Sequence, residues 1–301
     1  MIPAPKPGCY EGVPEHIYHS WDALSASVMR DLAQYPPAQV YHDRLHPKNP
    51  TPAMEFGRMV HALVLEGASA AEARFAEGPD VDLRTTEGKK LWQEFERTAL
   101  AAGKQAMRPP EFAKCTAMHR MVYRDAYARL LLEAPGYTEV SLVWHDALLD
   151  FPCKARLDRV IRLGGTTLIL DLKTAHSAAP DAFRRIIADK HYDIQPVWYP
   201  RALEAVFGPA SRQFLWLAVD KDPPHLPAVY QPGPAALERG HASVDRLSRL
   251  YVTCRRDDVW PGYTEGGEAV VLDLPRWAWL RKDGEEFSPP PDDPNDQEIR
   301  F

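Results

Sequence analysis

Two aspartates and a lysine in the middle of the chain have the types and spacing of a metal-dependent hydrolytic site. Asp171 and Lys173 stand two apart in TTLILDLKT (166–174), a nearly continuous apolar run that is typical of a buried strand. Alternate residues of a strand share a face, so both side chains are expected to point the same way. A buried carboxylate is costly to desolvate without a partner, and a divalent cation is an obvious one.

A second carboxylate is predicted to lie beside the first. Asp158 belongs to FPCKARLDRVIRL (151–163), which Gly164-Gly165 separates from the run above. An antiparallel pairing of 158 with 171 is centred on that Gly-Gly pair, as a hairpin requires. The two carboxylates would then be direct or diagonal neighbours within about 8 Å, a separation that suits Mg²⁺ or Mn²⁺. The alternative for Asp171 and Lys173 is a surface ion pair at a strand end.

The surrounding segments predict an α/β fold. The first third has helical periodicity over 28–35, where Ser25 is a plausible N-cap, and over 52–67, 86–102 and 111–134. Segments 137–146 and 151–163 predict a hairpin, 212–221 another strand and 234–257 a long helix. We therefore expect a central mixed β-sheet flanked by helices, with a helical N-terminal part over 10–135 and a core over 136–260.

These motifs together resemble a nuclease superfamily. Leu157-Asp158, followed after twelve residues by Asp171-Leu172-Lys173, resembles the PD-(D/E)xK core, which implies a restriction-endonuclease-like fold. Gln195-Pro-Val-Trp-Tyr199 resembles the QxxxY element of the RecB-type branch, and Gly57-Arg-Met-Val-His61 its GxxxH element. Residues 10–225 are similar to the RecE-type exonucleases of phages and prophages, with the elements in the same order.

The chain departs from that pattern at two places. Leu157 stands where the family usually has Pro, which removes no ligand. Pro196 and Pro200 interrupt the helix that carries Gln195 and Tyr199. Pro196 fits a first helical turn, but Pro200 is expected to kink the helix, and the position of Tyr199 depends on that kink.

The resemblance implies a role for each residue. Asp158, Asp171 and His61 would hold Mg²⁺, for which Mn²⁺ would substitute, with the main-chain carbonyl of Leu172 as a further ligand and Glu139 at or near the metal. Lys173 would orient or deprotonate the attacking water, and Gln195 and Tyr199, which share a helix face, would position the scissile strand.

Purely structural or surface roles remain open as alternatives for several of these residues. His61 could be a core histidine, Tyr199 an ordinary packing residue and Glu139 an edge-strand carboxylate. Ser25 and Arg30 could contact a terminal phosphate from a helix start, or could simply be solvated surface.

The activity that the resemblance implies is 5′→3′ degradation of linear double-stranded DNA, leaving 3′ single strands for an annealing or recombinase protein. It also implies a ring-shaped homo-oligomer, a trimer or tetramer. The alternatives are an endonuclease of the same superfamily, cutting internally or at branched structures, and a non-catalytic DNA-binding or assembly protein.

The amino-acid composition limits the class of protein further. The 301 residues carry 36 Lys and Arg against 42 Asp and Glu, for a net charge of −6. The Pro-rich tail 283–301, which has the composition of a flexible segment, has seven acids and one Arg and accounts for all of that charge, leaving 1–282 neutral as one predicted domain. The four cysteines are isolated, which argues against a disulfide framework or a zinc ribbon. The RecB-type nucleases that carry an iron–sulfur cluster have three cysteines together near the C-terminal end, where this sequence has only Cys254, so the resemblance implies no cluster. No apolar run is long enough for a membrane span, and we expect a cytoplasmic protein.

Overall fold

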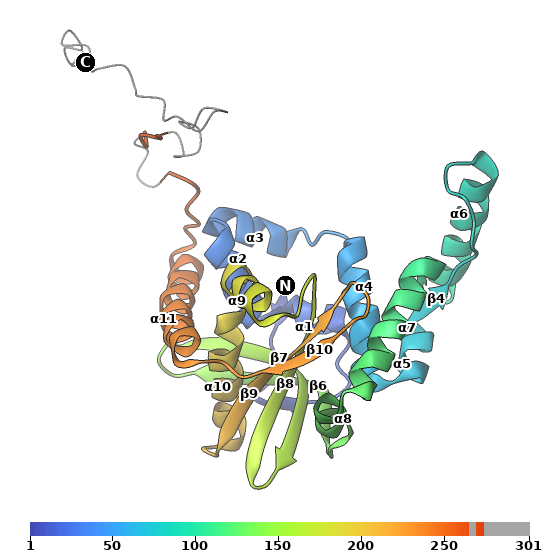
Figure 1. Ribbon diagram of the computed structural model, residues 1–301. Coiled ribbons are helices and arrows are strands. Elements are labelled where there is room, and N and C mark those ends of the chain that lie inside the picture. The colour runs from blue at the N-terminus through green and yellow to red at the C-terminus, as the bar shows by residue number, and fades with distance from the viewer. Residues whose placement is uncertain (265–268, 274–301) are drawn as a thin grey trace, which may run out of the picture. The chain divides into compact units, whose positions relative to one another are not determined.

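A six-stranded mixed sheet forms the centre of the protein in the computed structural model, which describes residues 1–264 and 269–273 (Figure 1). The strand order is β10-β9-β8-β7-β6-β2, and only the β8–β9 pair is parallel. These strands are β2 (Gly8–Tyr10), β6 (Gly136–Asp146), β7 (Phe151–Leu163), β8 (Thr166–Ala175), β9 (Arg212–Asp220) and β10 (Pro227–Tyr230). The expected α/β architecture with a mixed sheet is confirmed.

Most of the helices precede the long strands in the chain, as predicted. They are α1 (Glu15–Ser20), α2 (Ala26–Gln34), α3 (Pro37–Leu45), α4 (Pro52–His61), a π-helical turn (Ala62–Glu66), α5 (Ala68–Arg74), α6 (Thr86–Ala101), α7 (Pro109–Arg124) and α8 (Ala126–Glu133). Four short strands form two small parallel pairs among them: β1 (Ile2–Pro3) with β3 (Trp21–Asp22), and β4 (Phe75–Glu77) with β5 (Gln105–Met107).

The remaining helices alternate with the later strands. They are α9 (Pro180–Asp189), a 3₁₀ turn (Tyr192–Ile194), α10 (Gln195–Phe207) and α11 (Pro234–Asp257). One predicted helix, 111–134, is in fact two. Asp125 ends α7 and caps α8, because its Oδ1 accepts a hydrogen bond from the amide of Ala128 at 2.8 Å.

Each face of the sheet is covered by its own hydrophobic core. On one face, Ile169 of β8 and Phe214 of β9 pack with residues of α2, α10 and α11, such as Met29, Trp198 and Leu247. On the other, alternate residues of the same strands, among them Leu170 and Leu172, pack with α4, α7 and α8. Burial on both faces explains why 166–174 is a nearly continuous apolar run. A polar residue within it therefore needs a specific partner.

Contacts divide the chain into two units, residues 1–260 and 261–301. The expected boundary at 282 and the acidic tail 283–301 lie outside the described residues. Within the part of the chain that the structure describes, no helix combines the length and apolar character that crossing a membrane demands.

Candidate metal centre

The hairpin of β7 and β8 brings Asp158 to Asp171. The strands pair antiparallel from Leu163↔Thr166 to Arg159↔Leu170 across the Gly164-Gly165 turn, so the next position of the same register is Asp158 with Asp171. The predicted register is confirmed. Asp158 also reaches across to β8, since its Oδ2 accepts a hydrogen bond from the amide of Leu172 at 2.8 Å.

Glu139 faces Asp158 from the other neighbouring strand. Thr138 pairs with Arg159 and Val140 with Leu157, which places Glu139 opposite Asp158 between them. Glu139 has φ +52°, in the left-handed region that a glutamate rarely adopts. Such a conformation persists only where its surroundings enforce it, and it is common at functional sites.

The side-chain alternation of β7 shifts at this point. Ala155 and Leu157 pack into one core, and Val160, an odd number of residues further on, packs into the same core. A regular strand would send it to the opposite face. The alternation is therefore irregular next to Asp158, whose carboxylate, like that of Glu139, points toward His61.

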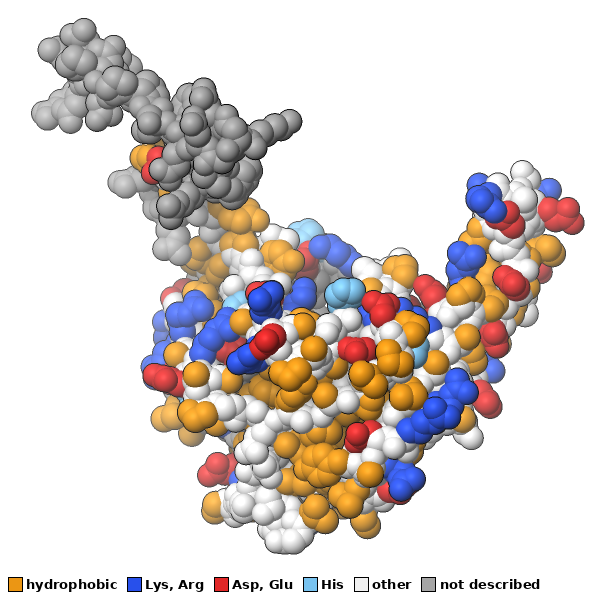
Figure 2. All heavy atoms as spheres, viewed as in Figure 1, with side chains coloured by type: hydrophobic (Ala, Val, Ile, Leu, Met, Phe, Trp, Pro, Cys, Tyr) orange, Lys and Arg blue, Asp and Glu red, His pale blue; other side chains and the backbone are white. Residues whose placement is uncertain are grey.

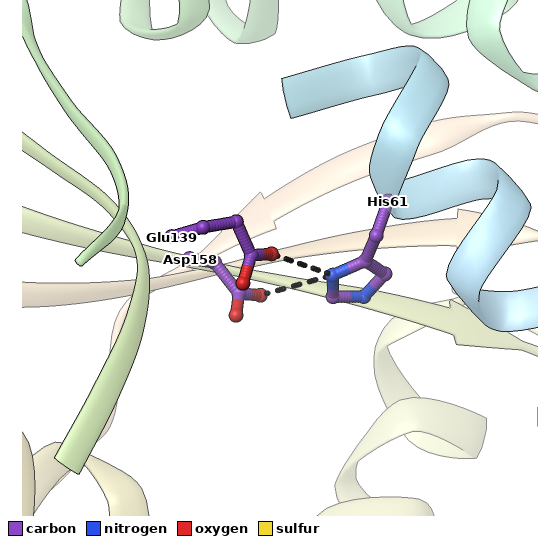
Figure 3. Close-up of side chains that lie close together, drawn as sticks. All are labelled: His61, Glu139 and Asp158. Carbon is purple, nitrogen blue, oxygen red and sulfur yellow. Dashed lines mark ion pairs between the residues drawn. The ribbon is translucent and has the colours of Figure 1, made fainter. Parts of the chain in front are cut away.

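His61 completes this group from the helical part of the chain. It is the last residue of α4, just before the π-helical turn, a kind of irregularity that is frequent at functional sites. Its Nδ1 lies 3.6 Å from Asp158 Oδ2 and 3.8 Å from Glu139 Oε1, and both carboxylates point toward the imidazole ring (Figure 3). Its Nε2 is 3.1 Å from the carbonyl oxygen of Leu172.

Asp171 makes a second, adjoining group with Lys173, Gln195 and Tyr199. Gln195 Nε2 donates to Asp171 Oδ1 at 2.7 Å and to the Tyr199 hydroxyl at 2.9 Å, and Lys173 forms an ion pair with Asp171 Oδ2. Asp171 is 1% exposed and Gln195 is 3% exposed. Pro200 lies inside α10, which runs as one helix over Gln195–Phe207, and Gln195 and Tyr199 form their hydrogen bond on one face of it.

The electrostatics of the site reflect three carboxylates crowded into a partly buried space. Burial, together with Asp171 and Glu139, raises the pKa of Asp158 to about 7 despite the opposing effect of His61. Burial alone would lower the pKa of His61, but Asp158 and Glu139 outweigh it and raise that pKa to about 9. Burial would raise the pKa of Glu139, yet His61 and Arg156 bring it below its ordinary value.

The donor set fits a hard divalent cation. One ligand atom from each of His61, Glu139 and Asp158 lies within 4.8 Å of the others. Two carboxylates and one imidazole suit Mg²⁺ or Mn²⁺, and a cation would relieve the crowding that raises the pKa of Asp158. Asp171 stands beside this group rather than in it, and the Leu172 carbonyl is in contact with His61.

A cleft of about 850 Å³ opens onto the group. His61, Glu139 and Asp158 line it, as do Tyr199 and Arg30. Ser25 does not, because it is 2% exposed and its hydroxyl accepts a hydrogen bond from the amide of Val28 as the N-cap of α2, as predicted.

Arg156 is a site residue that the sequence reading missed. It lies two positions before Asp158 on β7, lines the cleft, and its Nε donates to Glu139 Oε2 at 2.7 Å. Its spacing from Asp158 was visible in the sequence, but nothing there predicted its pairing with Glu139.

The chain matches one known family. Residues 25–272 match the sequence model of DUF3799, described as a PDDEXK-like domain of unknown function. No curated protein matches.

A solved structure shares the fold. A crystal structure titled "Putative exonuclease", from Eubacterium rectale, superimposes with a TM-score of 0.59 at 14% identity, covering 88% of this chain and 96% of that one. The structure of SSO0001 reaches a TM-score of only 0.25 at 15% identity, over 52% of this chain and 70% of that chain, and does not bear on the fold.

Proposed function

Because the chain belongs to the DUF3799 family of PDDEXK-like domains, we propose that it is a divalent-metal-dependent nuclease, specifically an exodeoxyribonuclease of linear double-stranded DNA. The observation that carries the proposal is the convergence of His61, Glu139 and Asp158 within 4.8 Å, beside the Asp171–Lys173 ion pair. The Eubacterium rectale neighbour, whose title names an exonuclease, supports the exonuclease reading.

We assign the cation, Mg²⁺ or Mn²⁺, to Asp158, Glu139 and His61. Asp171 and the Leu172 carbonyl are further proposed ligands, because they lie on the segment of β8 that Asp158 and His61 contact. When bound, such a cation supplies Lewis-acid polarisation of the phosphate and activation of the attacking water.

The residues around the cation are proposed to act in catalysis and in DNA positioning. Lys173 orients the attacking water, and its ammonium offsets charge in the transition state. Gln195 and Tyr199 hold Asp171 and position the scissile strand. Arg30, on the cleft, contacts a terminal phosphate, and Ser25 supports it by starting the helix that carries it.

The finer assignment is to a RecE-like enzyme that degrades DNA 5′→3′ and leaves 3′ single strands for recombination. An annealing or recombinase protein would take up that strand, and a ring-shaped trimer or tetramer in the cytoplasm would account for processive degradation. The order of the GxxxH, D…DxK and QxxxY elements supports this assignment.

One experiment separates the readings. Linear duplexes labelled at the 5′ or the 3′ end, and closed circular duplex, are incubated with the protein and Mg²⁺, Mn²⁺ or EDTA. We expect metal-dependent mononucleotide release from the 5′ end and intact circles. Cutting of circles would indicate the endonuclease instead, and binding without turnover in either metal would indicate a non-catalytic DNA-binding protein.

A further inference from the structure

Tyr192 presents its ring to the lysine of the proposed active site. The residue begins the 3₁₀ turn that leads into α10, three positions before Gln195. Lys173 Nζ lies 4.7 Å from the centroid of the Tyr192 ring. The guanidinium carbon of Arg30 lies 4.8 Å from the same centroid. Both distances fall within the range of a cation–π interaction, about 6 Å or less.

Lys173 needs such a contact to keep one position. Its ammonium ends a flexible four-carbon stem, and its ion-pair partner is Asp171, whose other oxygen is already held by Gln195. Other charged groups near it are Asp158, which attracts the ammonium, and His61 and Arg30, whose positive charges repel it. An ion pair fixes the ammonium from one side, and a ring face adds a second constraint.

We infer that Tyr192 is a positioning residue that holds the Lys173 ammonium at Asp171 through its ring face. The contact itself stands on geometry, while its consequence for catalysis rests on the proposed function. Tyr192 is itself held in place, since it packs against the core that α10 and β8 share.

The second cation on the ring extends the role of Tyr192. Arg30 is anchored by donating from Nε to the carbonyl of Lys190 at 3.1 Å, in the loop just before Tyr192. Tyr192 therefore links the residue proposed to bind the DNA end to the residue proposed to act on the scissile phosphate.

The test replaces Tyr192 by Phe and by Phe carrying two, three or four ring fluorines in the full-length protein. Fluorine withdraws electron density from the ring and weakens its attraction for a cation while nearly preserving its shape. We expect Tyr192→Phe to keep the parent kcat, and kcat to fall stepwise with each fluorine. Tyr192→Leu should lower kcat by roughly 3- to 30-fold.

Tyr230 provides the matched control. It packs against the same core, and its ring stacks on Phe183 with centroids 5.4 Å apart rather than on a cation. The same fluorinated series at 230 should leave kcat unchanged. A kcat that is insensitive to fluorination at 192, or equally sensitive at 230, would overturn the proposal.

A second readout needs neither metal nor turnover. Metal-free protein is pulsed with acetic anhydride, and acetylation of Lys173 is measured by mass spectrometry. Loss of the ring contact should speed acetylation of Lys173 in the tetrafluoro and Leu variants relative to Tyr192→Phe; unchanged rates would refute the contact. If the parent protein cleaves no DNA, the proposed function fails while this readout still decides the role of Tyr192.

Discussion

At the scale of single residues, replacing Lys173 is expected to reduce DNA cleavage without reducing metal binding. Lys173→Met removes the ammonium beside Asp171 but none of the three residues that form the metal group. We expect cleavage to fall by about 10²- to 10³-fold, the usual cost of losing one group that stabilises the transition state. Calorimetry should find Mn²⁺ affinity close to that of the parent.

Lys114 offers a control of the same chemistry outside the site. Its Nζ lies 3.2 Å from Asp222 and 5.8 Å from the ring of Phe56, so it too is an ion-paired lysine near an aromatic ring. Lys114→Met should cleave normally. Full activity in Lys173→Met would remove Lys173 from the mechanism.

The titration of His61 and Asp158 makes metal-free stability depend on pH. His61 has a folded pKa of about 9, above its ordinary 6.5, so its protonated form contributes stability that is complete below 6.5 and lost as pH rises through about 9. Asp158, at about 7 against an ordinary 3.8, keeps its proton to higher pH in the folded state than in the unfolded state, so its contribution is complete below 3.8 and is lost as pH rises to about 7. Thermal unfolding in EDTA should therefore show a Tm that declines from about pH 4 to pH 9.

Metal should reverse that trend, because ligands bind cations in their deprotonated forms. With saturating Mn²⁺ we expect the decline to shrink or invert, and His61→Gln should flatten the metal-free decline above pH 7. His145→Gln, which removes an exposed histidine on β6, should follow the parent curve. A metal-free Tm that does not vary with pH would contradict these pKa assignments.

At the scale of elements, the left-handed backbone of Glu139 in β6 is expected to lower the stability of the fold while it places a carboxylate for metal binding. Glu139→Asn places a residue that tolerates φ +52° there and removes one carboxylate from the crowded group. Without metal, we expect the free energy of unfolding to rise by about 1 kcal/mol from relieved backbone strain, offset in part by the lost ion pair with Arg156. Mn²⁺ affinity, measured by calorimetry, should fall.

Asp150 tests whether strain relief alone explains the result. It lies in the β6–β7 turn with φ +49°, away from the metal group. Asp150→Gly relieves the left-handed strain there, offset in part by the lost ion pair with His145, and should leave Mn²⁺ affinity unchanged. Equal metal affinity in Glu139→Asn and the parent would remove Glu139 from the site.

The elements also show how far the sequence could predict the site. Alternation and the Gly-Gly turn were sufficient to predict the register that places Asp158 beside Asp171, because hairpin pairing is a local property. The left-handed Glu139 could not be predicted, since regular alternation assumes extended backbone. That Asp171 turns to Gln195 rather than to His61 depends on the packing of α10, a contact between residues 24 apart that spacing does not reveal.

At the scale of the whole molecule, charge is unevenly distributed. Figure 2 shows Lys and Arg side chains gathering over α9 and α11, where Arg184, Arg185 and Arg246 are exposed. The chain is nonetheless acidic overall, because the last nineteen residues carry its entire net charge. A neutral body with a basic face can bind DNA through phosphate contacts, while the acidic tail opposes the approach of a polyanion.

Removing residues 283–301 is therefore expected to tighten DNA binding at low salt. Fluorescence anisotropy with a labelled duplex should show a lower Kd for the truncated protein than for the parent at about 50 mM salt. The difference in Kd should vanish near about 1 M salt, where the Debye length is only about 3 Å. A full-length variant with the seven tail acids changed to Asn or Gln separates charge from length: it should match the truncated protein. If it binds like the parent while the truncated protein binds more tightly, the bulk of the tail rather than its charge opposes DNA binding. Equal Kd values for all three proteins would show that the tail does not affect DNA binding.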